Sequence, residues 1–150
     1  MNQSEAGQRT LHGHIVFAGP PGSGKSAMLA WIAGALEPLV RGRLYSLTDG
    51  EERTRYFDLL LLEDVPFAGR RVTPYLVAAP GGGIHAETRR ALLARADALV
   101  FVADGRRSAL AHNIEAYEEM RAVAPDAPAV VALNLQDLPD ALSAAELRDA

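Results

Sequence analysis

The feature that most constrains this chain is a glycine-rich run near its N-terminus. Residues 19–26 read Gly-Pro-Pro-Gly-Ser-Gly-Lys-Ser, which satisfies the pattern G-x-x-x-x-G-K-[ST] in full. The run follows an apolar stretch at residues 14–18 and precedes a helix-favouring stretch at residues 26–36. Glycines let the backbone curl so that successive N–H groups converge on an anion, and the following helix adds its positive dipole end. We therefore expect a loop that binds the phosphates of a nucleoside triphosphate.

Each residue type in this loop has a physical role. Lys25 supplies a positive charge for the β- and γ-phosphates, and the Ser26 hydroxyl suits Mg²⁺. The other expected phosphate contacts are positions whose backbone N–H groups line the loop or open the helix: Gly19, Gly22, Ser23, Gly24 and Ala27. A phosphate loop does not by itself choose between GTP and ATP.

The rest of the chain alternates apolar runs with helical patterns. Four runs are expected to be strands, at residues 56–62, 72–78, 98–103 and 129–133. Helices are expected at residues 85–95 and 114–124, and Ser143 with Glu146 forms a capping box that opens a last helix. Residues 1–11 are expected to be a polar tail, and residues 39–55 are polar and turn-rich. The pattern predicts one α/β domain over residues 1–150, with a mostly parallel sheet covered by helices on both faces.

Composition excludes several classes of function. The chain has no cysteine, which excludes disulfides and thiolate metal sites. A net charge of -4 gives no electrostatic reason to expect nucleic-acid binding. The first residues lack the apolar region of a signal peptide, and no apolar run is long enough to span a bilayer. We therefore expect a cytoplasmic protein without membrane insertion.

Several further segments resemble one family, the bacterial gliding-motility small GTPases of the MglA type, which are Ras-like. They occur in matching order from about residue 14 to the end: Ser-Leu-Thr at 46–48, Glu-Arg-Thr at 52–54, Phe-Asp at 57–58, Ala-Pro-Gly at 79–81, Phe-Val-Ala-Asp at 101–104 and Asn-Leu-Gln-Asp-Leu-Pro-Asp-Ala-Leu at 134–142. The resemblance implies a Ras-like P-loop fold with one antiparallel edge strand. It also implies GTP or GDP with Mg²⁺ as ligands, and a function in cell polarity. The family's usual partner is a dimeric roadblock-fold protein.

The resemblance also implies site residues. Residues 42–57 would form the first switch, in which Thr54 coordinates Mg²⁺ and Arg53 is an arginine finger supplied from the same chain. Gly81 would belong to the second switch. Three residues after the last apolar run would bind guanine: Asn134, Gln136 and Asp137. Asp137 can accept two hydrogen bonds from the guanine N1 and N2 donors, which adenine cannot supply.

Three positions depart from the family pattern. Ala78 stands where Ras-like GTPases have aspartate and the gliding family has threonine, so this residue cannot help to hold Mg²⁺. Gly82 replaces the glutamine that orients the attacking water, which predicts very slow hydrolysis. Leu135 replaces the lysine of the guanine motif, which weakens guanine preference. The family also continues with one more strand and helix, without which residues 129–133 lie at a sheet edge.

Two other interpretations of the same residues stay open. An apolar strand that ends in Asp104 is also typical of the metal-binding strand of ATPases, so an ATP-dependent phosphotransferase or ATPase is one alternative. Ala78, Gly82 and Leu135 together favour a second alternative, an interaction module that has lost nucleotide binding. The intact Lys25 and Ser26 argue against that module.

Overall fold

The computed structural model describes residues 10–36, 40–48 and 55–150. Within them, the strands form a seven-stranded sheet in the order β2-β3-β5-β1-β6-β7, with β4 paired beside β5. The strands are β1 (Leu11–Ala18), β2 (Arg41–Thr48), β3 (Arg55–Glu63), β4 (Val65–Phe67), β5 (Arg70–Ala78), β6 (Ala98–Asp104) and β7 (Ala129–Asn134). The helices are α1 (Lys25–Leu36), α2 (Ala86–Leu93), α3 (Leu110–Val123) and α4 (Ala144–Asp149).

The sheet is mostly parallel. β1 lies between β5 and β6 and is parallel to both, and β6 is parallel to β7. β3 runs antiparallel to β5 and to β2. The α/β fold expected from the sequence is therefore confirmed, with one refinement. Antiparallel pairing is not confined to one edge strand: β3 lies one place inside the edge because β2 covers it, and the short β4 also runs antiparallel to β5.

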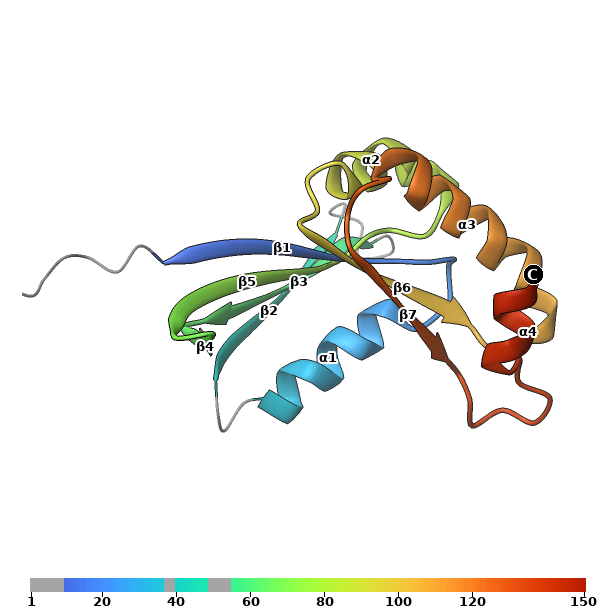
Figure 1. The fold of residues 1–150 in the computed structure, drawn as a ribbon, viewed down its shortest axis with the longest axis horizontal. Coiled ribbons are helices and arrows are strands. Elements are labelled where there is room, and N and C mark those ends of the chain that lie inside the picture. Colours follow the sequence, from blue (N-terminus) through green and yellow to red (C-terminus); the bar gives the residue numbers. More distant parts are fainter. Residues whose placement is uncertain (1–9, 37–39, 49–54) are drawn as a thin grey trace, which may run out of the picture.

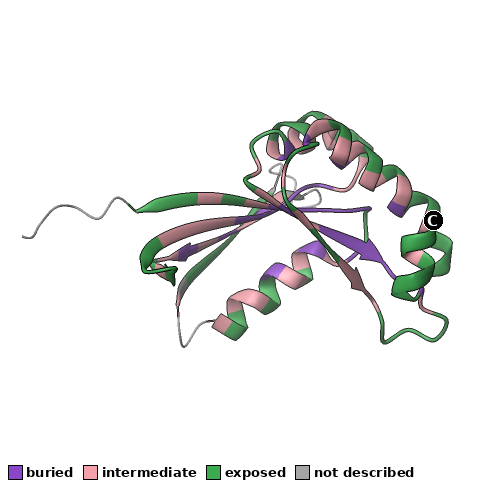
Figure 2. Ribbon diagram, viewed as in Figure 1, coloured by how far each residue is buried: buried purple, intermediate pink, exposed green. Residues whose placement is uncertain are grey.

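Helices cover both faces of the sheet (Figure 1). α1 lies on one face, and α2 and α3 lie on the other. A buried cluster around Leu29, Leu60 and Val102 packs between α1 and the sheet. A second cluster around Leu93, Phe101 and Met120 packs under α2 and α3. Burial is concentrated in the central strands, as Figure 2 shows, because only these strands are covered on both faces.

One strand of the sheet, β2, was not predicted from the sequence. Residues 39–55 were expected to be turn-rich, but β2 occupies Arg41–Thr48 and pairs with β3 along its length. Residues 42–47 are all exposed, so over this described range β2 has no buried face. Its sequence therefore lacks the strict alternation of apolar and polar residues by which a half-buried strand is predicted. Because β2 and β3 also occupy most of residues 42–57, the segment implied as the first switch is largely strand in this structure.

The expected edge at the C-terminal side is present. β7 is the last strand of the sheet on that side, and Val130 and Val131 are exposed on it. The capping box at Ser143 also forms: its side chain accepts from the Glu146 backbone, and the Glu146 carboxylate accepts from the Ser143 backbone. α4 therefore begins where the sequence predicted.

Candidate nucleotide-binding site

The glycine-rich run connects the carboxyl end of β1 to the start of α1. β1 is central in the sheet, so the loop lies between the loop that follows β5 on one side and those that follow β6 and β7 on the other. Ligands of parallel α/β sheets bind beyond the carboxyl ends of the strands. All the sequence-predicted contacts that the structure describes follow β1, β5 or β7, and therefore lie at this edge.

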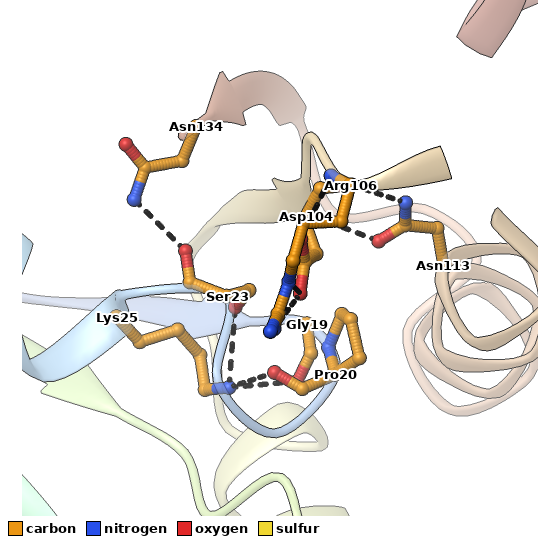
Figure 3. A network of polar contacts seen from close by, with 8 residues as sticks. All are labelled: Gly19, Pro20, Ser23, Lys25, Asp104, Arg106, Asn113 and Asn134. Carbon is orange, nitrogen blue, oxygen red and sulfur yellow. Dashed lines mark hydrogen bonds and ion pairs between the residues drawn. The ribbon is translucent and has the colours of Figure 1, made fainter. Parts of the chain in front are cut away.

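Lys25 closes the loop on itself. Its ammonium donates to the backbone oxygens of Gly19 and Pro20, each at 2.8 Å, and lies 3.5 Å from Ser23 Oγ (Figure 3). Burial, with a smaller effect from the charge of Arg89, lowers the pKa of Lys25 from 10.5 to about 8. A buried cation whose hydrogen-bond partners are neutral oxygens gains stabilisation when an anion arrives, so this geometry suits phosphate.

Asn134 braces the loop from the end of β7. Its side-chain amide donates to the Ser23 backbone oxygen at 2.8 Å. The same amide nitrogen fills the space in which a Cβ on Gly24 would stand, and Gly24 has a φ of +94°. A larger residue at position 24 is therefore disfavoured by both conformation and space. In this structure Asn134, expected from the sequence at the guanine base, is hydrogen-bonded to the phosphate loop.

The segment after β7 forms a tight loop. Leu135 has a left-handed φ of 58°. The Gln136 side-chain amide donates to the Leu142 backbone oxygen at 3.2 Å, so it ties the loop together. Leu142 in turn donates its backbone N–H to the Gly105 oxygen at 2.7 Å, which fixes the loop to the end of β6. Asp137 is exposed in the turn that follows.

A cleft of about 740 Å³ opens on the other side of the loop. It is lined by Pro21, Gly22, Gly24, Lys25, Ser26, Ala27 and Ala30, by Phe57 and Asp58 of β3, and by residues 78–85 after β5. Gly81 packs against Pro21 so closely that a Cβ on Gly81 would stand 2.7 Å from the Pro21 nitrogen. The two loops that would hold a γ-phosphate are thus in contact.

Asp58 is a carboxylate of this cleft that our sequence reasoning did not assign to the site. It is buried, pairs in register with Ala78 of β5, and accepts a hydrogen bond from Ser46 Oγ at 2.6 Å. Ala78 itself lines the cleft and offers only a methyl group. The sequence signal for Asp58 is a single acidic residue between Phe57 and the four leucines of β3, where a buried charge requires a partner.

Arg89 of α2 holds the loop after β5. Its Nη1 donates to the backbone oxygens of Pro80 at 3.2 Å and Gly82 at 2.8 Å. Its Nε and Nη2 donate to the Glu119 carboxylate of α3 at 3.0 and 3.1 Å. This bidentate pair is the stronger kind of ion pair, so the position of the loop depends on both helices.

The end of β6 is fixed by a polar network (Figure 3). Asn113 of α3 accepts from the Asp104 backbone N–H and donates to its oxygen, both at 2.8 Å. The Asp104 carboxylate accepts from the backbone and guanidinium of Arg106, and these hydrogen bonds lower the pKa of Asp104. Because Arg106 occupies this carboxylate, the geometry disfavours the metal role that an ATPase would give to Asp104.

Two sequence-predicted site residues, Arg53 and Thr54, lie outside the described residues. His85, directly before α2, also lines the cleft. Among the residues that the structure describes, none of the helices could span a bilayer.

The fold and the loop together define a P-loop nucleotide-binding protein of the Ras-like type. The chain is 30% identical to the mutual gliding-motility protein MglA of Myxococcus xanthus, over 95% of this chain and 76% of that protein. It is 31% identical to the tRNA modification GTPase MnmE of Dichelobacter nodosus, over 96% of this chain but only 32% of that protein. No family model matches the chain. The chain belongs to the MglA family of small GTPases.

Proposed function

We propose that the chain is a guanine-nucleotide switch that binds GTP and GDP with Mg²⁺ and hydrolyses GTP very slowly. The observation that carries this proposal is the contact between the phosphate loop and the end of β7. Asn134 of the guanine motif donates to the Ser23 backbone oxygen of the phosphate loop at 2.8 Å. The segment proposed to bind the base is therefore hydrogen-bonded to the loop proposed to bind the phosphates. In this proposal, Lys25 and the loop N–H groups bind the phosphates, and Asp137 and Gln136 face the base.

Oxygen ligands in the cleft support a magnesium site. Ser26 and Asp58 both line it, and a hydroxyl with a carboxylate is a donor set that suits Mg²⁺. Bound Mg²⁺ would neutralise charge on the phosphate oxygens. Ser26 would hold the ion directly, and Asp58 would accept a hydrogen bond from its water in place of the side chain that Ala78 lacks. Thr54 would complete the site when a γ-phosphate is present.

Slow hydrolysis follows from the chemistry of the loop after β5. Gly82 has no side chain to orient a water, and its backbone oxygen is engaged by Arg89. The remaining catalytic group in this proposal is Arg53, which would stabilise charge on the transferring phosphoryl group. The nucleotide would then act mainly by ordering the loops around the γ-phosphate for a partner to recognise.

The biological role and partner are proposed by similarity to the family. The relative from Myxococcus is named for gliding motility, which supports a role in motility here. A role in cell polarity is proposed from the family resemblance alone. A roadblock-type regulatory protein is the partner that the family resemblance implies. It would contact the loops whose conformation the nucleotide sets.

Equilibrium binding of a fluorescent GDP with Mg²⁺, competed by GTP, GDP and ATP, tests the proposal. We expect guanine nucleotides to displace the probe and ATP to fail. Phosphate release from GTP should stay below about one turnover per hour, slower than the intrinsic rate of Ras without its activating partner, which is about one to two per hour. Lys25→Ala, which removes the loop cation, should abolish binding. Equal displacement by ATP would support the phosphotransferase alternative, and absence of binding by the folded protein would support the interaction module.

A further inference from the structure

The guanidinium of Arg106 lies beside the phosphate loop although the residue belongs to neither the phosphate motif nor the guanine motif. A Cβ on Gly22 would stand 3.1 Å from Arg106 Nη2. Figure 3 shows the side chain extending from the end of β6 towards the loop. Arg106 therefore places a positive charge next to Gly22, on the side of the loop that faces β6 and β7.

Asp104 and Asn113 hold this cation in position. The Arg106 Nε donates to Asp104 Oδ1 at 2.9 Å, its Nη2 donates to Asp104 Oδ2 at 2.5 Å, and Asp104 is fully buried. Asn113 fixes the Asp104 backbone on both sides of the residue. The Arg106 side chain is nevertheless 50% exposed, and a guanidinium has five N–H donors, so donors remain for a ligand. A charge fixed in this way loses little conformational entropy when it binds.

The loop after β7, residues 135–142, is called the base loop here because it carries the guanine motif. It lacks the lysine that this motif usually provides. Leu135 occupies that position with an apolar side chain. A Cβ on Gly105, directly before Arg106, would stand 2.3 Å from the Asn134 backbone oxygen and 2.8 Å from the Gln136 side-chain nitrogen, so Arg106 follows a point where the end of β6 approaches the base loop closely. A nucleotide that spans the two loops must pass this point.

We propose that Arg106 is an additional nucleotide-binding residue that donates to the phosphate chain where it passes Gly22. This inference rests on the proposed function and specifies a contact within the same site. The guanidinium supplies positive charge that Leu135 cannot, while Asp104 keeps it oriented. The ligand class is a nucleoside di- or triphosphate, because the loop beside Arg106 binds phosphates and planar guanidinium groups match their oxygens.

Arg107 provides a matched control. It is the adjacent arginine, its side chain is similarly exposed at 56%, and it also has an acidic partner. That partner is Glu146 of α4, at 2.7 Å, and the bond lowers the pKa of Glu146 to about 2. Arg107 therefore shares charge and exposure with Arg106 but faces α4 instead of the phosphate loop.

The test compares GDP binding by wild type, Arg106→Gln and Arg107→Gln at low and at moderate salt, with Mg²⁺ present. We expect Arg106→Gln to weaken binding about tenfold at low salt, the effect of one charge-assisted hydrogen bond. Added salt should weaken wild type more than Arg106→Gln, because screening acts on the charge that the variant lacks. Arg107→Gln should stay within about twofold of wild type.

Arg106→Lys completes the design. It retains the charge but not the planar fork, so it should recover part of the lost affinity, and it carries the test if Arg106→Gln fails to fold. Equal binding by both glutamine variants would overturn the inference. So would a loss in Arg106→Gln whose salt dependence matches wild type, since that pattern reports a structural role. Failure of the wild type to bind any nucleotide would instead overturn the proposed function, and this inference with it.

Discussion

Lys25 is the only lysine of the sequence, and its ammonium is buried against neutral carbonyl oxygens. Its pKa of about 8 lies below the 10.5 of an ordinary lysine. Between these pH values the unfolded chain binds more protons, so the free energy of unfolding of the nucleotide-free protein should rise with pH across this window. Bound phosphates would reverse the shift, because an anion favours the charged form.

A single lysine makes this pKa directly measurable. In protein labelled with ¹³C-lysine, one ε-carbon signal should titrate with a midpoint near 8 without nucleotide. Addition of GDP and Mg²⁺ should move the midpoint above about 10. A midpoint near that of free lysine in the nucleotide-free protein would show that the ammonium is solvated and not held by the loop.

Asp137 is the residue on which base preference should depend. A carboxylate accepts from guanine N1 and N2, whereas an amide also donates, so Asp137→Asn should exchange guanine preference for xanthine preference. We expect at least about tenfold weaker GDP binding with improved xanthosine diphosphate binding, measured by competition against a fluorescent nucleotide. Asp140→Asn, in the same exposed loop, is the control. If the two variants behave alike, Asp137 is not a base contact.

At the scale of elements, α2 and α3 set the position of the loop that follows β5. Arg89 connects the Pro80 and Gly82 oxygens to Glu119, with its side chain only 13% exposed. Arg90 also pairs with Glu119, but at 3.5 Å and with a side chain that is 64% exposed. The two adjacent arginines thus share a partner and differ in burial and in contact with the loop.

Arg89→Ala should therefore lower the free energy of unfolding by about 1–3 kcal/mol, because it leaves half-buried polar groups without a donor. Arg90→Ala should change it by less than about 0.5 kcal/mol. Urea unfolding measures both, and amide hydrogen exchange of residues 81–86 should accelerate in Arg89→Ala alone. Similar unfolding curves for the two variants would mean that the loop is held by its packing against Pro21.

The elements that the sequence predicted correctly are those whose own residues specify them. Apolar runs identified β3, β5, β6 and β7, and the capping box identified α4. β2 was missed because its order comes from pairing with β3 and not from apolar residues of its own. α3 begins at Leu110, four residues before the predicted start, because a 3₁₀ turn at Arg107–Ala109 leads into it.

The same distinction holds for the candidate site. The phosphate loop is local in sequence, so its pattern was sufficient to predict it. Asp58 and Arg106 reach the site because the strand order places β3 and β6 on either side of β5 and β1. Arg89 reaches it because α2 packs against α3. Such contacts depend on partners distant in the chain, and a single sequence does not record them.

For the whole molecule, the open side of the sheet at β7 has consequences for association. One flank of β7 pairs with β6, and the strand is last in the order of the described sheet. Val130 is 62% exposed and Val131 53%, and successive residues of a strand point to opposite faces, so apolar surface lies on both sides of this edge. An edge of this kind favours pairing with another chain.

We expect the 150-residue protein to associate as its concentration rises, and Val130→Lys with Val131→Lys to suppress this, because lysines on an edge strand oppose strand pairing. Light scattering between about 10 and 200 μM measures the effect, a range in which weak edge pairing is expected to become visible. Phe67→Lys is the control, since Phe67 is 71% exposed on β4, away from this edge. If that variant reduces association equally, added charge and not the β7 edge is the cause. Because Val130 and Val131 do not line the cleft beside the phosphate loop, the double variant should retain the GDP affinity of wild type, which distinguishes a protected edge from a damaged fold.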